Sequence, residues 1–282
     1  DRPKQGCAVR EGLVQRCLAT NKGSFMLKNK VALVTGASSG IGRAIALVWA
    51  REGAKVVVSD VNVQAGEETA ALVCSAGGDA IFVAADVGKP EDCEALVQRT
   101  VAHYGRLDVA CNNAGIGGPQ APTADYPLDG WAQVININLS GVFYGMKYQI
   151  AAMLKNGGGA IINMASILGS VGFATAPAYT AAKHGVVGLT KAAAIEYSAH
   201  GVRINAVGPA FIHTPMISGL EQDAGINAML VGAHPIGRLG QPEEVAELVT
   251  WLASSKASRL WALRGLGFFI GFLSMDVSWK PV

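Results

Sequence analysis

The sequence predicts a single-domain α/β protein in which a parallel β-sheet carries helices on both faces. Six short apolar segments alternate with segments of helical spacing, which is typical of parallel sheets with crossover helices. The 282 residues are 50% hydrophobic and 16% charged, enough apolar material for a buried core and too much for a disordered chain. The central part of the chain has no internal repeat and no linker that would divide it into two domains.

Composition also argues against several classes of function. The formal net charge of +2 is too small to indicate a nucleic-acid partner. No uncharged apolar run reaches the length of about 20 residues that a membrane span needs. The five cysteines show no zinc-type spacing, so we expect no metal site and a reducing, cytoplasmic location. Cys111 ends an apolar run and is expected in the core.

The first two strand–helix units are expected at the start of the domain. Residues 31–35 (VALVT) are an apolar run that a glycine closes, as in a buried parallel strand. Residues 41–51 have helical spacing, and Gly53 ends this helix. The second unit combines a strand at 55–59 (KVVVS) with a helix at 63–76.

The next two units follow the same pattern. A strand at 80–84 leads to a helix that Pro90 opens and that runs to about Tyr104, because proline is favoured in the first helical turn. A fourth strand is expected at 107–111. It is followed by a long helix from about Leu128 to Leu154.

The last two units complete the predicted sheet. A strand at 160–164 precedes a helix at 178–199, and a strand at 202–207 precedes a helix at 242–253. Sheets of this kind bind ligands at the carboxyl ends of their strands. We therefore expect the chemistry at the junctions where strands pass into loops.

A glycine-rich turn lies between the first strand and the first helix. Its sequence, Thr35-Gly-Ala-Ser-Ser-Gly-Ile-Gly42, contains three glycines that permit a tight turn and a close approach of backbone to ligand. Backbone N–H groups at the start of a helix stabilise a phosphate charge. The turn therefore predicts a binding site for the pyrophosphate of a dinucleotide.

Three motifs together resemble the short-chain dehydrogenase/reductase family. They are the T-G-x-x-x-G-x-G turn, Asn112-Asn-Ala-Gly115 after the fourth strand, and Tyr179-Thr-Ala-Ala-Lys183 on a helix. The resemblance covers about Lys28 to Ser258. It implies a Rossmann-type doubly wound parallel sheet, a nicotinamide cofactor and a small-molecule alcohol or ketone substrate.

Cofactor contacts are expected along the whole edge of the sheet. Asp60 directly follows the second strand, where a carboxylate accepts hydrogen bonds from the adenosine ribose and repels a 2′-phosphate. No arginine follows it, so we expect NAD rather than NADP. The resemblance implies contacts with the adenine from Asp86 and Val87. The expected cofactor-binding residues are Gly36, Ser38, Ser39, Gly40, Ile41, Gly42, Asp60, Asp86, Val87, Asn113, Ala114, Gly115, Tyr179, Lys183, Pro209, Ile212 and Thr214.

Four residues form the candidate catalytic group. Tyr179 and Lys183 are spaced to share one helix face. A nearby ammonium and the positive nicotinamide ring favour the phenolate, so we expect the pKa of Tyr179 to fall. Ser166 follows the fifth strand, where its hydroxyl can hydrogen-bond the substrate oxygen. The resemblance implies that Asn138, within the long helix, supports a water chain to Lys183.

The loop after the sixth strand contains Pro209, Ile212 and Thr214, and the last two match positions that hold the cofactor carboxamide in the family. Ala210 replaces the glycine that is usual there, and alanine tolerates a positive φ poorly. Residues 215–235 are expected to form a mobile lid. The expected apolar pocket wall comprises Ile167, Leu168, Val171, Phe173, Met216 and Leu220.

The two ends of the chain differ from this domain. Residues 1–25 carry more basic than acidic side chains and no apolar signal-peptide region, so we interpret them as a leader or non-native extension, with a targeting remnant as the alternative. Residues 26–258 form the predicted catalytic domain. Residues 259–282 are an atypical tail in place of the last strand that the family usually has, as a frameshift would produce.

These features predict an NAD(P)-dependent alcohol dehydrogenase or ketone reductase that moves a hydride between NAD(H) and a secondary alcohol or ketone, with Tyr179 as acid or base. The apolar wall favours cyclic or apolar substrates. Two alternatives stay open: an NADP-dependent carbonyl or 3-oxoacyl reductase, and an inactive dinucleotide-binding or regulatory protein. The resemblance implies a homotetramer if the C-terminus is intact, and the atypical tail makes that assembly doubtful.

Overall fold

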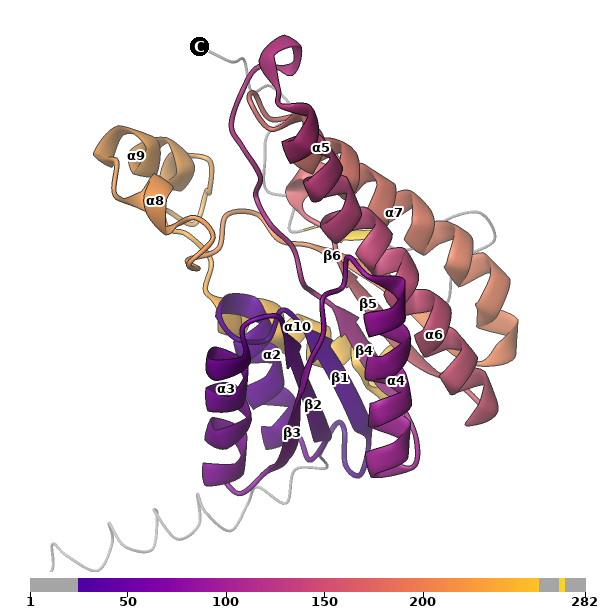
Figure 1. The fold of residues 1–282 in the computed structure, drawn as a ribbon. Coiled ribbons are helices and arrows are strands. Elements are labelled where there is room, and N and C mark those ends of the chain that lie inside the picture. The colour runs from indigo at the N-terminus through magenta and orange to yellow at the C-terminus, as the bar shows by residue number, and fades with distance from the viewer. Residues whose placement is uncertain (1–24, 259–268, 272–282) are drawn as a thin grey trace, which may run out of the picture.

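A parallel β-sheet forms the centre of the part of the chain that the structure describes. The structure is a computed structural model, and it describes residues 25–258 and 269–271. Over these residues the sheet has seven strands in the order β3-β2-β1-β4-β5-β6-β7 (Figure 1). The predicted leader, apart from Phe25, and the predicted tail, apart from 269–271, lie outside the described residues.

Six of the strands correspond to the six segments that the sequence predicts. The strands are β1 (Val31–Thr35), β2 (Lys55–Asp60), β3 (Asp79–Ala84), β4 (Val109–Asn112), β5 (Gly159–Met164), β6 (Val202–Gly208) and β7 (Phe269–Gly271). β1 pairs in parallel with β2 on one side and with β4 on the other. The chain therefore reverses its direction of winding at β1, and the crevice beyond the ends of β1 and β4 is where such sheets bind ligands.

The predicted helices are also present, with one difference. They are α2 (Gly40–Arg51), α3 (Val63–Ser75), α4 (Pro90–Tyr104), α5 (Leu128–Ile135), α6 (Gly141–Lys155), α7 (Pro177–Tyr197) and α10 (Pro242–Ala253). Two short helices, α8 (Ser218–Glu221) and α9 (Ala224–Gly232), lie in the segment that the sequence predicts as a lid, where no helix was expected. The single long helix expected at 128–154 is α5 and α6, joined by a π-helical turn at Asn136–Ser140. Single π-helical turns of this kind often mark functional sites.

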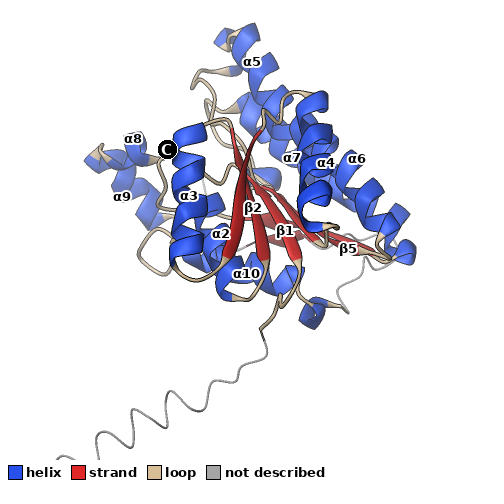
Figure 2. Cartoon of the chain, turned by 60° about the horizontal axis from the view of Figure 1, so that its bottom comes forward, coloured by secondary structure: helices blue, strands red, loops and turns tan. Residues whose placement is uncertain are grey.

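Helices cover both faces of the sheet (Figure 2). Side chains of successive strand residues point to opposite faces. Leu33 of β1 accordingly packs in a core cluster with residues of α4, α6 and α7, whereas Val34 packs in another with residues of α2 and α10. Burial on both faces explains why the strands are continuous apolar runs and not alternating ones.

β7 lies at the edge of the sheet beside β6. Its backbone register is parallel, with Phe269 next to Ala206 and Gly271 next to Gly208. The sequence predicts six strands and assigns this part of the chain to an atypical tail. Three tail residues thus form a short seventh strand through backbone pairing, which depends little on the sequence of the segment.

Two features of the described residues bear on membrane and metal binding. None of the helices in this part of the chain is long and apolar enough to cross a membrane. Within the same residues, no group of three or more His, Cys, Asp or Glu side chains is arranged to hold a metal ion. Cys111 is fully buried in the core, as predicted.

Candidate active site

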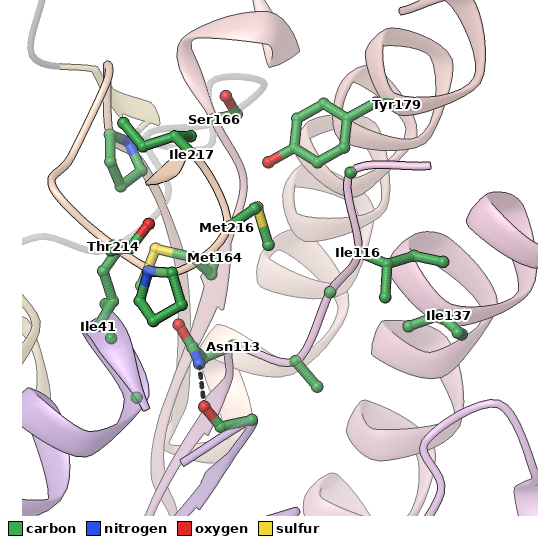
Figure 3. A pocket seen from close by; sticks show the side chains of 18 of the residues that line it. Ile41, Asn113, Ile116, Ile137, Met164, Ser166, Tyr179, Thr214, Met216 and Ile217 are labelled. Atoms are coloured by element: carbon green, nitrogen blue, oxygen red, sulfur yellow. Dashed lines mark hydrogen bonds between the residues drawn. The ribbon is translucent and has the colours of Figure 1, made fainter. Parts of the chain in front are cut away.

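A cavity of about 510 Å³ lies where β1, β2, β5 and β6 end. All the cofactor-binding residues that the sequence predicts line this cavity, and so do Ser166, Tyr179 and Lys183. Figure 3 shows part of the lining, with Tyr179 entering from α7 and Thr214 from the loop after β6. The structure thus brings together residues that are far apart in the sequence.

The glycine-rich turn adopts a conformation that requires glycine. Gly36 and Gly40 have φ angles of 64° and 51°, in the left-handed region. A Cβ atom on Gly42 would lie 2.1 Å from the carbonyl oxygen of Gly36, so no side chain fits there. The turn therefore keeps the backbone at the start of α2 open toward the cavity. This geometry fits a pyrophosphate bound by backbone N–H groups.

Asp60 is fixed at the end of β2 by two backbone donors. The N–H of Ser38 donates to Oδ2 at 3.0 Å, and the N–H of Asn62 donates to Oδ1 at 2.9 Å. The carboxylate is thus attached to the glycine-rich turn. Arg43 does not line the cavity, because its guanidinium donates to Thr69 and to the carbonyl oxygen of Ala65 on α3. Negative charge therefore faces this end of the cavity.

Asn113 connects the end of β4 to the glycine-rich turn. Its Nδ2 donates to the carbonyl oxygens of Thr35 at 2.9 Å and Gly36 at 3.1 Å. Its backbone N–H donates to Oγ1 of Thr35 at 3.1 Å. Near β3, Asp86 accepts a hydrogen bond from the N–H of Gly88 at 2.9 Å. These contacts hold the cavity lining in place, and none of them involves Ser166, Tyr179 or Lys183.

A network of hydrogen-bonded side chains lies between the strands β4 and β5 and the helices α6 and α7. Nδ2 of Asn112 donates to Oδ1 of Asn163 at 2.9 Å and to Oε1 of Gln149 at 3.0 Å. Nδ2 of Asn163 donates to Oγ1 of Thr190 at 2.9 Å. All four side chains are buried. The network joins β4 and β5 to α6 and α7, and so fixes the helix that carries Tyr179 and Lys183.

Lys183 is a buried ammonium next to Tyr179. Its Nζ donates to the carbonyl oxygen of Met164 at 2.7 Å and lies 5.4 Å from the centroid of the Tyr179 ring. The side chain is only 3% exposed. Burial therefore lowers the pKa of Lys183 to about 8, because the charged form is poorly solvated.

The sequence led us to expect a lowered pKa for Tyr179, but the polypeptide by itself raises it. Burial raises the pKa of Tyr179, and interaction with the hydroxyl of Ser166 lowers it by less. The prediction from sequence weighed the charges of Lys183 and nicotinamide and could not weigh desolvation. A phenolate at this position consequently needs more positive charge than the chain alone supplies.

Ser166 presents a hydroxyl group to the cavity. It is 8% exposed, and its Oγ accepts a hydrogen bond from the N–H of Leu168 at 3.2 Å. The hydroxyl hydrogen can be donated to the phenol oxygen of Tyr179, whose pKa this interaction lowers, or to a substrate oxygen. The Tyr179 hydroxyl points into the same cavity (Figure 3). Together these groups can hold and deprotonate an alcohol, or protonate a ketone.

Asn138 lies in the π-helical turn and does not line the cavity. Both ends of its amide bind one backbone residue: Nδ2 donates to the carbonyl oxygen of Ile116 and Oδ1 accepts from its N–H, each at 2.8 Å. The side chain therefore fixes the segment that follows β4, where Gly115 and Ile116 line the cavity. Its predicted part in a water chain stays a prediction.

The loop after β6 and the lid close the other side of the cavity. A Cβ atom on Gly40 would lie 3.3 Å from Cγ2 of Thr214, so this loop packs against the glycine-rich turn. Among the described residues, positive φ angles outside glycine occur at Asn29 and Thr175. Ala210 therefore has an ordinary conformation, and the strain that its substitution for glycine led us to expect is absent.

The apolar wall agrees with the sequence prediction in most positions. Ile167, Leu168, Phe173, Met216 and Leu220 line the cavity, whereas Val171 does not. The sequence prediction missed Phe211, which also lines it. Its place between Pro209 and Ile212, both predicted as cofactor contacts, was the signal that could have identified it.

Comparison with known proteins shows which family the chain is similar to. A family model described as enoyl-(acyl carrier protein) reductase matches residues 36–261. The chain is 50% identical over 235 residues to cyclohexanol dehydrogenase of Acinetobacter sp. strain SE19, covering 83% of this chain and 92% of that protein. It is 44% identical over 234 residues to 2,5-dichloro-2,5-cyclohexadiene-1,4-diol dehydrogenase of Sphingobium indicum strain B90A, covering 82% and 92%.

A solved structure also has this fold. The crystal structure of a levodione reductase superposes with a TM-score of 0.83 and 36% sequence identity. The match covers 87% of this chain and 96% of that chain. The overall fold of the described chain therefore has a counterpart of known structure.

Proposed function

The chain belongs to the short-chain dehydrogenase/reductase family, and we propose that it oxidises cyclic or otherwise apolar secondary alcohols with NAD as the hydride acceptor. Its relatives are dehydrogenases and reductases by name, and the protein is an oxidoreductase that uses a nicotinamide cofactor. We propose three things beyond this: the choice of NAD, the substrate class and the roles of individual residues.

One observation carries the proposal. Tyr179, Lys183 and Ser166 line the same cavity as the glycine-rich turn. An acid–base group and a phosphate-binding turn in one cavity are what hydride transfer to a dinucleotide requires.

Each side chain has a distinct part in the proposed reaction. A bound nicotinamide ring supplies the hydride acceptor. The Ser166 hydroxyl donates a hydrogen bond to the substrate oxygen, and the phenol oxygen of Tyr179 takes the proton of the alcohol. The ammonium of Lys183 favours the phenolate form of Tyr179 through its charge. Asn138 acts as a positioning residue, because its amide holds Ile116.

Asp60 supports the preference for NAD. Its carboxylate is attached to the glycine-rich turn through the N–H of Ser38. A 2′-phosphate near this carboxylate would meet like charge, whereas a ribose hydroxyl would find an acceptor. Arg43 is engaged with α3, so it does not neutralise Asp60 in the described structure.

The substrate class rests on the cavity wall and on the relatives. Ile167, Leu168, Phe173 and Leu220 contribute apolar surface, which binds a hydrocarbon ring better than a charged chain. Two relatives are named for alcohols on six-membered carbon rings. Cyclohexanol is therefore the first substrate to test.

The proposal is tested by measuring NADH or NADPH formation with cyclohexanol, other cyclic alcohols, open-chain secondary alcohols and a 3-hydroxyacyl thioester. The alcohol is varied at saturating cofactor, and NAD or NADP is then varied at saturating alcohol. We expect turnover with cyclic alcohols and a kcat/KM for NAD at least about tenfold above that for NADP. Asp60→Ala should reduce this ratio by about tenfold or more, because it removes the repulsion of the 2′-phosphate. Asp125→Ala, at an acidic residue that does not line the cavity, is the matched control.

Three outcomes would overturn parts of the proposal. A preference for NADP that Asp60→Ala leaves unchanged would refute the cofactor assignment. Turnover confined to the acyl thioester would favour the 3-oxoacyl reductase alternative. Binding of NAD without turnover of any alcohol would favour a regulatory protein.

A further inference from the structure

Three aromatic rings form a row that runs from the lid into the cavity wall. The ring centroids of Phe173 and Phe211 are 6.0 Å apart with planes at 61°, and those of Phe211 and His234 are 5.9 Å apart at 70°. These are edge-to-face arrangements, which aromatic pairs favour. Both phenylalanines line the cavity, whereas His234 does not. His234 thus contacts the wall from behind.

His234 is held in one neutral tautomer by two backbone groups. The N–H of Phe211 lies 3.3 Å from Nε2, and the carbonyl oxygen of Leu230 lies 2.8 Å from Nδ1. An N–H group only donates and a carbonyl only accepts, so Nε2 must be the acceptor and Nδ1 must carry the hydrogen. The imidazole therefore joins Phe211, which lies 23 residues before it in the sequence, to Leu230 in the last turn of α9.

Both phenylalanines are fixed on their backbone side as well. The N–H of Gly240 donates to the carbonyl oxygen of Phe211 at 3.0 Å. Thr175, two positions after Phe173, has a φ of 66°, and the N–H of Ala121 donates to its carbonyl oxygen at 3.0 Å. A left-handed threonine persists only where its surroundings hold it. Backbone hydrogen bonds therefore hold the two segments that carry these rings.

We propose that Phe173 and Phe211 form the wall that selects ring-shaped alcohols, and that His234 is the residue that positions Phe211. The inference rests on the proposed function and adds the residues that determine its specificity. A flat, fixed aromatic surface contacts many atoms of a carbon ring at once. A ring also loses less conformational freedom on binding than an open chain does. Both effects favour cyclohexanol over 2-hexanol.

The test compares kcat/KM for cyclohexanol and 2-hexanol in four variants, each checked for folding by its Tm and by NADH binding. Phe211→Leu and Phe173→Leu should lower the ratio of cyclohexanol to 2-hexanol by about tenfold or more. His234→Leu should have a similar effect, mainly through KM for cyclohexanol, with kcat for 2-hexanol little changed. His234→Gln should keep the ratio within about threefold of the original.

The glutamine variant separates a hydrogen-bonding role from a merely structural one. Its amide oxygen can accept from Phe211 and its amide hydrogen can donate to Leu230, whereas leucine can do neither. Phe25→Leu and His200→Leu are matched controls, since both residues are exposed and neither lines the cavity. Equal loss of selectivity in the glutamine and leucine variants, with NADH binding retained, would overturn the role of His234.

Binding measurements keep the inference distinct from the proposed function. Calorimetric titration in the presence of NAD, which cannot reduce a ketone, should give a Kd for cyclohexanone about tenfold or more below that for 2-hexanone. Phe211→Leu should remove most of this difference. Equal Kd values in the unmodified protein would overturn the inference even if alcohols are turned over. If the protein binds cyclohexanone more tightly than 2-hexanone but turns over no alcohol, the proposed function is overturned. The inferred role of Phe173 and Phe211 in selecting rings is then retained.

Discussion

Lys183 and Tyr179 are the residues whose charge states matter most to the proposed chemistry. Burial lowers the pKa of Lys183 to about 8 and raises that of Tyr179. Two titratable groups this close lose their protons in steps that belong to the pair. The pH dependence of the reaction therefore reports on both residues together.

We expect opposite pH dependence in the two directions of the reaction. Oxidation requires Tyr179 to accept a proton, so kcat/KM for the alcohol should rise with pH as the pair of Tyr179 and Lys183 loses its first proton. Reduction requires Tyr179 to donate one, so kcat/KM for the ketone should fall over the same range. Lys183→Met should lower oxidation by about 100-fold at neutral pH and shift the inflection upward, because the phenolate loses its neighbouring charge.

Initial rates across the pH range, with saturating NAD, check this prediction. Lys191→Met is a suitable control, since Lys191 lies exposed on the same helix. A profile for Lys183→Met that keeps the inflection of the unmodified protein would contradict the account of the pair.

The sequence predicts the position or chemistry of some single residues better than that of others. Gly36, Gly42 and Asp60 were predictable, because each stands at a fixed place beside the end of a strand. The direction of the pKa shift of Tyr179 was not predictable, because desolvation depends on what surrounds the ring in three dimensions. His234 was missed for a related reason, since its partner Phe211 is distant in the sequence.

At the scale of elements, Arg203 links β6 to the end of α10. Its guanidinium donates to the carbonyl oxygens of Leu252 at 2.7 Å, Ala253 at 3.1 Å and Ser254 at 3.1 Å. These carbonyls have no partner within the helix. A cation at a helix C-terminus also interacts favourably with the helix dipole. The contact therefore fixes the last helix against the sheet.

Arg203→Met should destabilise the protein by about 2–4 kcal/mol, because it leaves buried carbonyl groups unpaired. The free energy of unfolding from urea titration measures this. Arg99→Met, at an exposed arginine on α4, should change it by less than about 0.5 kcal/mol. Equal losses in the two variants would contradict the role assigned to Arg203.

The elements themselves were largely predictable, because apolar runs and glycines mark their limits. The π-helical turn at Asn136–Ser140 was not, since its sequence is compatible with an ordinary helix. It depends on tertiary contacts such as the bonds of Asn138 to Ile116. β7 was not predicted either, because backbone pairing with β6 defines it.

At the scale of the whole molecule, the doubly wound sheet explains why the site forms at all. Its strands are parallel, so their carboxyl ends lie along one edge. The glycine-rich turn, Asp60, Ser166 and Thr214 all follow strand ends and therefore meet in one cavity. The homotetramer and the cytoplasmic location stay predictions.

The central claim is that this cavity takes a hydride from a secondary alcohol with Tyr179 as the base. The most direct test incubates the full chain with NAD and cyclohexanol deuterated at the carbinol carbon, and follows deuterium into NADH by mass spectrometry. We expect deuterated NADH and cyclohexanone from the unmodified protein. Tyr179→Phe should still bind NADH and lose at least about 99% of the rate. Absence of transfer from every alcohol, or more than about a tenth of the rate in Tyr179→Phe, would contradict the claim.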